Sequence, residues 1–133
     1  MRVFLDANVL FSASNAGSNI ARLIAWLAER ETAVTSDLAV EEARKNLALK
    51  RAAWVLAFED VLEGLEIVPS VLFQLPVPIK TKDAPQLCAA IRSQCSLFVT
   101  GDRRDFGHLY GQRVQGVEII SLLRLAEILA GGS

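Results

Sequence analysis

Short apolar runs and helical apolar stripes alternate along most of the chain. Five mainly apolar runs, bounded by polar or turn-forming residues, are typical of strands in a buried sheet: residues 3–5, 32–35, 65–68, 97–100 and 117–120. The i, i+3, i+4, i+7 spacing of an amphipathic helix follows the first run, at Ile20, Leu23, Ile24 and Leu27. The pattern therefore predicts strands that alternate with helices.

Capping and breaking residues set the limits of the expected helices. Their first turns are expected at Ser18 or Asn19, Ser36 or Asp37, Ala52, Asp83 and Ser121. Gly64 and Gly131 are expected to end two of them. Residues 70–82 contain two prolines and are expected to form an irregular connection.

This order of elements is typical of one fold class. Strands joined by helical crossovers form parallel sheets with helices on both faces. The composition, 52% hydrophobic and 22% charged, suits a compact α/β protein. We expect residues 1–133 to form a single domain, a three-layer α/β/α sandwich with a central, mainly parallel sheet.

Charge and hydropathy limit the classes of function. The formal net charge is −1 at pH 7, so bulk positive charge does not attract nucleic acid to this chain. The sequence shows neither an apolar run near the ~20 residues of a transmembrane helix nor a signal-peptide pattern. We expect a cytoplasmic protein with no membrane association.

Carboxylates follow the ends of the expected strands. Asp6 closes the first strand, and Asp102 follows the strand at residues 97–100. Asp83 opens the helix that leads into that same strand. Because ligands of open parallel sheets bind outside the carboxyl ends of the strands, we expect these three acids to converge.

Two adjacent glutamates compete to be the fourth acid. On the expected helix, Glu42 lies on the face of Leu38, Ala39 and Leu49, beside the stripe that must meet the sheet. Glu41 lies on the solvated side with Lys45. Helical phase thus favours Glu42, with Glu41 as the alternative.

Four like charges at one edge of a sheet repel one another and raise one another's pKa. Mg²⁺ or Mn²⁺ prefers carboxylate oxygens and would relieve this repulsion. One or two such ions can promote phosphodiester hydrolysis. We therefore expect a divalent-metal site formed by Asp6, Glu42, Asp83 and Asp102.

A resemblance to a known family rests on four segments: LDANVL near the N-terminus, SDLAVEE at 36–42, KDAPQLCAA at 82–90 and VTGDRRDF at 99–106. In this order and spacing they resemble the PIN-domain nucleases, which include the VapC-type toxins of prokaryotic toxin–antitoxin pairs. The resemblance spans about residues 2–122. It implies a PIN-like fold, metal-dependent hydrolysis of phosphodiesters, usually of RNA, and frequent homodimers. A toxin of this kind would also have an antitoxin partner.

The resemblance also assigns roles to individual residues. It places the catalytic and metal-binding acids at Asp6, Glu42, Asp83 and Asp102, with Asp105 as an auxiliary metal ligand. It implies that Asn8, Ser36 and Thr100 orient these ligands by hydrogen bonds.

Basic residues near the acids are candidates for contacts with RNA. They are Lys80, Lys82, Arg103, Arg104, His108 and Arg113. Two other interpretations stay open. A PIN-like module could bind RNA without catalysis. A haloacid-dehalogenase-like phosphatase also begins with a strand and an aspartate, but it requires a second aspartate where this chain has Asn8.

An apolar surplus in the helices between Asp37 and Glu63 predicts a homodimer. These helices carry Leu47, Leu49, Trp54, Val55, Leu56 and Phe58, more apolar surface than one helix face buries against a sheet. The alternative is that the two helices pack on each other as a hairpin within one subunit.

Overall fold

A computed structural model of the chain describes residues 1–131. Its centre is a six-stranded sheet in the order β3-β2-β1-β4-β6-β5. The strands are β1 (Arg2–Leu5), β2 (Thr32–Ser36), β3 (Glu66–Val68), β4 (Leu97–Val99), β5 (Arg113–Val114) and β6 (Val117–Ile120). Neighbouring strands are parallel except β5, which is antiparallel to β6. The expected mainly parallel sheet is therefore confirmed.

Helices connect the strands along the described residues. They are α1 (Ala7–Ala13), α2 (Asn19–Arg30), α3 (Asp37–Lys50), α4 (Val55–Glu63), α5 (Ala84–Arg92), α6 (Arg103–Phe106) and α7 (Leu122–Leu129), with short 3₁₀ turns η1 (Ala52–Trp54) and η2 (Gly107–Leu109). The hydroxyls of Ser18, Ser36 and Ser121 accept hydrogen bonds from first-turn amides, as expected of caps. None of the helices in the described part combines the length and the apolarity needed to cross a membrane.

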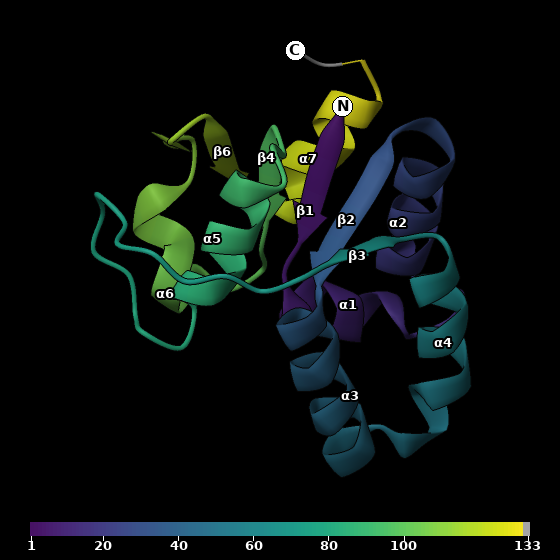
Figure 1. Cartoon of the computed structure of the whole chain (residues 1–133). Coiled ribbons are helices and arrows are strands. Elements are labelled where there is room, and N and C mark those ends of the chain that lie inside the picture. Colours follow the sequence, from purple (N-terminus) through teal and green to yellow (C-terminus); the bar gives the residue numbers. More distant parts are fainter. Residues whose placement is uncertain (132–133) are drawn as a thin grey trace.

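Two cores lie on opposite faces of the sheet. Because successive side chains of a strand point to opposite faces, Val3 and Leu5 enter one core and Phe4 enters the other. The first core includes buried residues of α1, α2, α3, α4 and α7, and the second includes those of α5 and α6. Figure 1 shows α5 and α6 on one side of the sheet and α2 and α4 on the other. The three-layer α/β/α prediction is thus confirmed.

The sequence pattern did not predict three elements, α1, α6 and β5. The apolar run of β1 continues directly into α1, so the spacing of apolar residues does not mark the change at Asp6, which caps α1. α6 and β5 have four and two residues, too few to show a period. Asp83 does precede α5, but its side chain makes no capping bond, because its backbone is already helical (φ −97°, ψ −21°).

The apolar surplus of α3 and α4 is mostly buried within the chain. Leu47 and Phe58 are fully buried, and Trp54 packs against the same core. Leu49 and Leu56 are 74% and 81% exposed. Packing within one subunit therefore accounts for most of the surplus, and these two leucines are the part left for contact with a second copy.

Candidate active site

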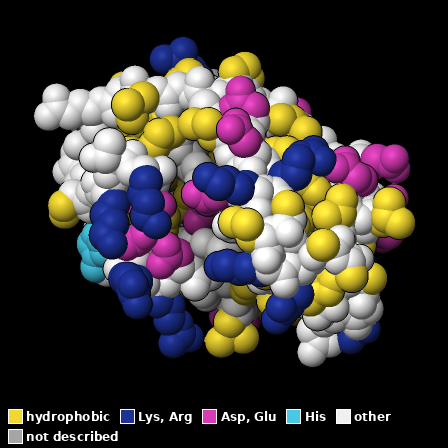
Figure 2. Space-filling model, turned by 90° about the horizontal axis from the view of Figure 1, so that it is seen from below, with side chains coloured by type: hydrophobic (Ala, Val, Ile, Leu, Met, Phe, Trp, Pro, Cys, Tyr) yellow, Lys and Arg dark blue, Asp and Glu magenta, His cyan; other side chains and the backbone are white. Residues whose placement is uncertain are grey.

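A cavity at the carboxyl end of the sheet collects the predicted acids. Leu5 of β1 pairs with Val99 of β4, and the Asp6 amide then donates to the Val99 carbonyl at 3.0 Å. α5 reaches the same edge, where Gln86 Oε1 accepts from the Ala7 amide at 3.2 Å. The cavity has a volume of about 330 Å³ and is lined by Asp6, Asn8, Phe11, Ser12, Glu42, Asn46, Lys50, Lys82, Asp83 and Asp102. From this end, acidic side chains lie in a hollow with Lys and Arg side chains around it (Figure 2).

Hydrogen bonds from the chain itself hold the buried carboxylate of Asp6. Its Oδ1 accepts from the Ala7 amide at 2.8 Å, and its Oδ2 accepts from the Thr100 hydroxyl at 2.7 Å and the Asn8 side-chain amide at 3.0 Å. Burial raises the pKa of Asp6 to about 6, although the bonds from Thr100 and Ala7 oppose this rise.

Asn8 and Thr100 tie the ends of β1 and β4 together. Asn8 Oδ1 accepts from the Gly101 amide at 2.8 Å, and Thr100 Oγ1 accepts from the Asp102 amide at 3.1 Å. Both side chains thus contact an acid of the cavity or the loop that carries one. Ser36, to which the resemblance gave the same role, uses its hydroxyl to cap α3.

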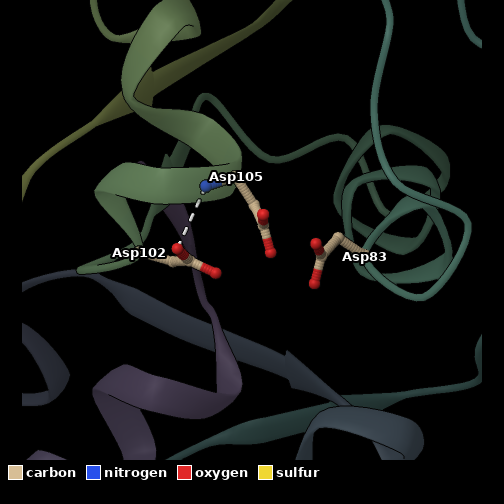
Figure 3. A group of neighbouring side chains, drawn as sticks. All are labelled: Asp83, Asp102 and Asp105. Carbon is tan, nitrogen blue, oxygen red and sulfur yellow. Dashed lines mark hydrogen bonds between the residues drawn. The ribbon is translucent and has the colours of Figure 1, made fainter.

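Three carboxylates form a tighter cluster at one side of the cavity. Oxygens of Asp83, Asp102 and Asp105 all lie within 4.8 Å of one another. Asp102 and Asp105 come from the start of α6, where Asp102 Oδ1 accepts from the Asp105 amide at 3.1 Å. The side chains of Asp83 and Asp105 point toward each other (Figure 3). Asp105 is therefore a full member of this cluster.

The facing carboxylates of Asp83 and Asp105 have opposite electrostatic surroundings. Asp83 is 7% exposed, and its Oδ2 has no hydrogen-bond partner among the described residues. Burial, together with the carboxylate of Asp105, raises the pKa of Asp83 to about 7. Lys80 Nζ lies 2.8 Å from Asp105 Oδ1, and this contact lowers the pKa of Asp105 below its usual range.

Helical phase places the two competing glutamates differently. Glu42 lines the cavity with the aspartates, whereas Glu41 lies in a neighbouring hollow that also includes Lys45. Of the three residues expected on the Glu42 face, Ala39 is buried, whereas Leu38 and Leu49 are exposed. Ala39 meets the core together with Ala43 and Leu47.

The basic candidates divide into two groups. Lys80 and Lys82 contact Asp105, and Lys82 also lines the cavity. Arg103, Arg104 and His108 are exposed on α6 and η2, beside Asp102 in the chain. Arg113 does not join them. It pairs with Glu118 on β5 and β6, and Glu118 lies level with Leu97, at the opposite end of β4 from the acids.

Four lining residues were not predicted from the sequence. Asn46 and Lys50 follow Glu42 at intervals of four along α3, so they share its helix face. This periodicity is visible in the sequence and could have identified both. Phe11 and Ser12 belong to α1, whose existence the pattern did not indicate.

The residues at the cavity fit a hard divalent cation. Carboxylate oxygens are the ligands that Mg²⁺ and Mn²⁺ prefer. A buried carboxylate oxygen without a partner, such as Asp83 Oδ2, is costly unless a proton or a cation satisfies it. The cluster of Asp83, Asp102 and Asp105, with Asp6 and Glu42 nearby, could therefore hold such an ion.

Comparisons with known proteins agree with this architecture. The crystal structure of VapBC2 from Rickettsia felis bound to a DNA fragment from their promoter matches with a TM-score of 0.67 and 16% identity, over 91% of this chain and 98% of that one. PAE2754 from Pyrobaculum aerophilum matches with a TM-score of 0.63 and 20% identity, over 98% and 90% of the two chains. No match was found among curated proteins. The family model of the PIN domain matches residues 3–112, and the chain therefore belongs to the PIN domain family.

Proposed function

We propose that this chain is a divalent-metal-dependent endoribonuclease. One observation carries the proposal: Asp6, Glu42, Asp83 and Asp102, which are far apart in the sequence, line a single cavity at the carboxyl edge of the sheet. Membership of the PIN domain family supports a nuclease role. Catalysis by this site requires no nucleophilic Ser or Cys, because the attacking group is water.

The side chains of the cavity suit hydrolysis of a phosphodiester. When bound, Mg²⁺ or Mn²⁺ supplies Lewis acidity and activates water. Asp6, Asp83, Asp102 and Asp105 would hold the ion, with Asn8 and Thr100 keeping Asp6 in place. Glu42 would orient the attacking water and accept its proton. Lys50 and Lys82 line the same cavity and would attract the phosphate of the RNA backbone.

A cleavage assay tests this proposal. The full chain is incubated with unstructured and structured RNA in Mn²⁺, in Mg²⁺ and in EDTA. We expect cleavage with metal, none in EDTA, and loss of cleavage in Asp102→Asn. Asp60→Asn is a matched control, because Asp60 is exposed on α4 and lies outside the cavity. RNA binding without cleavage under all conditions would favour the non-catalytic interpretation.

The likeness to VapBC2 supports a role as the toxin of a toxin–antitoxin pair. We propose a cytoplasmic, single-domain protein that pairs with an antitoxin protein. Expression of the parent should arrest growth, and Asp102→Asn should abolish the arrest. Normal growth with active, soluble parent protein would contradict the toxin role. The phosphatase alternative has no support at position 8, where Asn8 is already bonded to Asp6 and to the Gly101 amide.

We also propose that the chain forms a homodimer in which Leu49 and Leu56 are buried. Both are large, exposed apolar side chains on neighbouring helices. Sedimentation velocity at micromolar concentration should give a dimer, and Leu56→Glu should shift it toward monomer. Trp54 is a poor test site because it packs against the core. A parent that sediments only as a monomer would refute this proposal.

A further inference from the structure

Among the described residues, Asp105 is the member of the tight acidic cluster that forms ion pairs with lysines. Lys80 Nζ lies 2.8 Å from its Oδ1, and Lys82 Nζ lies 3.7 Å from its Oδ2. The Asp105 side chain is 3% exposed, so water screens this carboxylate little. Both lysines come from the end of the irregular connection before α5. The chain thus supplies two positive charges to a buried carboxylate from outside the cluster.

Only the carboxylate side of these ion pairs is buried, and the two lysine side chains are exposed. Their exposed fractions are 57% and 67%, so little packing holds them in place. An exposed ammonium group regains hydration when it moves into solvent, and this offsets part of the attraction to Asp105 that it loses. Asp83 differs, because its side chain points toward Asp105 (Figure 3) while its Oδ2 is buried without a hydrogen-bond partner among the described residues. The cluster therefore contains one carboxylate paired with a removable cation and one carboxylate oxygen with no partner.

We infer that Lys80 competes with a divalent cation for Asp105 and so weakens cation binding at the cluster. This inference rests on the proposed metal site. Lys80 and Lys82 each contact one oxygen of Asp105, so a cation that binds this carboxylate approaches at least one ammonium group. Two positive charges a few ångströms apart repel each other in a partly buried site, and a cation that binds all three carboxylates would therefore drive Lys80 toward solvent. Lys80 is thus a positioning residue that sets the concentration of metal at which the site fills.

The inference requires two effects of opposite sign when Lys80 is replaced. Without metal, Lys80→Met removes the nearest counterion of a buried carboxylate, so the melting temperature in EDTA should fall. With Mn²⁺, the same variant lacks the competitor, so Mn²⁺ should bind about tenfold more tightly. A residue with a merely structural role would lower stability without tightening metal binding. Lys82→Met should have a smaller effect, because Lys82 is farther from Asp105.

Calorimetric titration of the full chain with Mn²⁺ tests the inference. The variants are Lys80→Met, Asp105→Asn and the double variant, with Lys45→Met as the control for net charge. Lys45 lies in the neighbouring hollow and should not alter Mn²⁺ affinity. In the Asp105→Asn background, the effect of Lys80→Met should shrink to less than about twofold, because Lys80 is no longer held at the cluster. Lys80→Gln replaces Lys80→Met if the latter fails to fold.

The outcomes separate this inference from the proposed function. Unchanged or weaker Mn²⁺ binding in both Lys80 variants, with a parent that binds Mn²⁺, would overturn the inference alone. Equal tightening by Lys45→Met would also overturn it, because net charge would then explain the effect. If neither the parent nor any variant binds Mn²⁺, both the proposed metal site and the inference fail.

Discussion

The two sides of the acidic cavity are built differently. On one side, both oxygens of Asp6 accept hydrogen bonds from the chain, including one from the Thr100 hydroxyl at 2.7 Å. On the other side, Asp83 and Asp105 face each other, and Asp83 Oδ2 is buried without a partner. The chain itself thus fixes the carboxylate of Asp6 before any ligand arrives. The facing pair, Asp83 and Asp105, retains an unsatisfied oxygen that a ligand could use.

This difference suggests that one side of the cavity orients the reacting groups and the other determines the affinity for the cation. A carboxylate held by three donors keeps its geometry but gains less from a cation, since its charge is already partly stabilised. A pair of close carboxylates gains more, because a cation relieves both desolvation and mutual repulsion. We therefore expect the Asp6 side to position the reacting groups and the Asp83 side to supply most of the binding free energy.

The largest expected effect is the loss of activity in Asp6→Asn. Replacement of an outer hydrogen-bonding partner typically costs 10–100-fold, and a direct ligand should cost at least about 100-fold. The measurement is kcat/KM for RNA cleavage with saturating Mn²⁺. Mn²⁺ affinity should fall less in Asp6→Asn than in Asp83→Asn. An equal or greater loss of affinity in Asp6→Asn would break the distinction between the two sides.

Thr100→Val should have an intermediate effect of about tenfold on activity. The variant removes the hydroxyl that donates to Asp6 Oδ2, so the pKa of Asp6 should rise above its value of about 6. The loss should be greatest at pH 6 and should diminish by pH 8, where Asp6 is ionised in both proteins. A pH-independent loss would show that Thr100 acts through geometry alone.

A smaller effect concerns stability without metal. Because the folded-state pKa of Asp83, about 7, lies above its unfolded value, the folded state binds more protons between about pH 4 and pH 7. Asp83 thus makes the parent less stable as the pH rises through this window. Asp83→Asn removes that cost and should raise the unfolding free energy in EDTA at pH 8 by about 1 kcal/mol.

Asp6→Asn should bring no such gain in EDTA. In this variant a side-chain NH₂ group replaces one of the two carboxylate oxygens. At the position of Oδ1 it would face the Ala7 N–H, and at the position of Oδ2 it would face the Asn8 side-chain NH₂, so a donor would meet a donor in either case. Urea unfolding of both variants at pH 5 and pH 8 compares the two sides directly. Equal stabilisation by the two substitutions would show that the Asp6 and Asp83 sides of the cavity do not differ in this way.

Much of the position of the acids could be predicted from the order of the strands and helices and from helical phase. Asp6, Asp83 and Asp102 could be placed together because strand ends and helix starts of a parallel sheet meet at one edge. Glu42 could be separated from Glu41 by helical phase. These arguments need only the order and period of long elements, which apolar spacing reveals.

The other parts of the site depend on short or irregular segments, in which apolar residues show no periodic spacing. The resemblance named Asp105 as an auxiliary ligand, but apolar spacing does not show that α6, a helix of four residues, turns it toward Asp83. Its contacts with Lys80 and Lys82 come from an irregular connection whose path the sequence does not indicate. Arg113 was misplaced beside the acids for the same reason, since the two-residue strand β5 carries it to the other end of β4.

Locating a bound ion in crystals of the parent grown with Mn²⁺ would test the proposed metal site. Anomalous diffraction should show a peak in the cavity at a bonding distance of about 2.0–2.2 Å from carboxylate oxygens of Asp83 and Asp102, absent from crystals grown in EDTA. A second data set from Asp83→Asn should show the peak weakened. Saturating Mn²⁺ without a peak in this cavity, or with a peak only elsewhere on the molecule, would show that these carboxylates do not form the metal site.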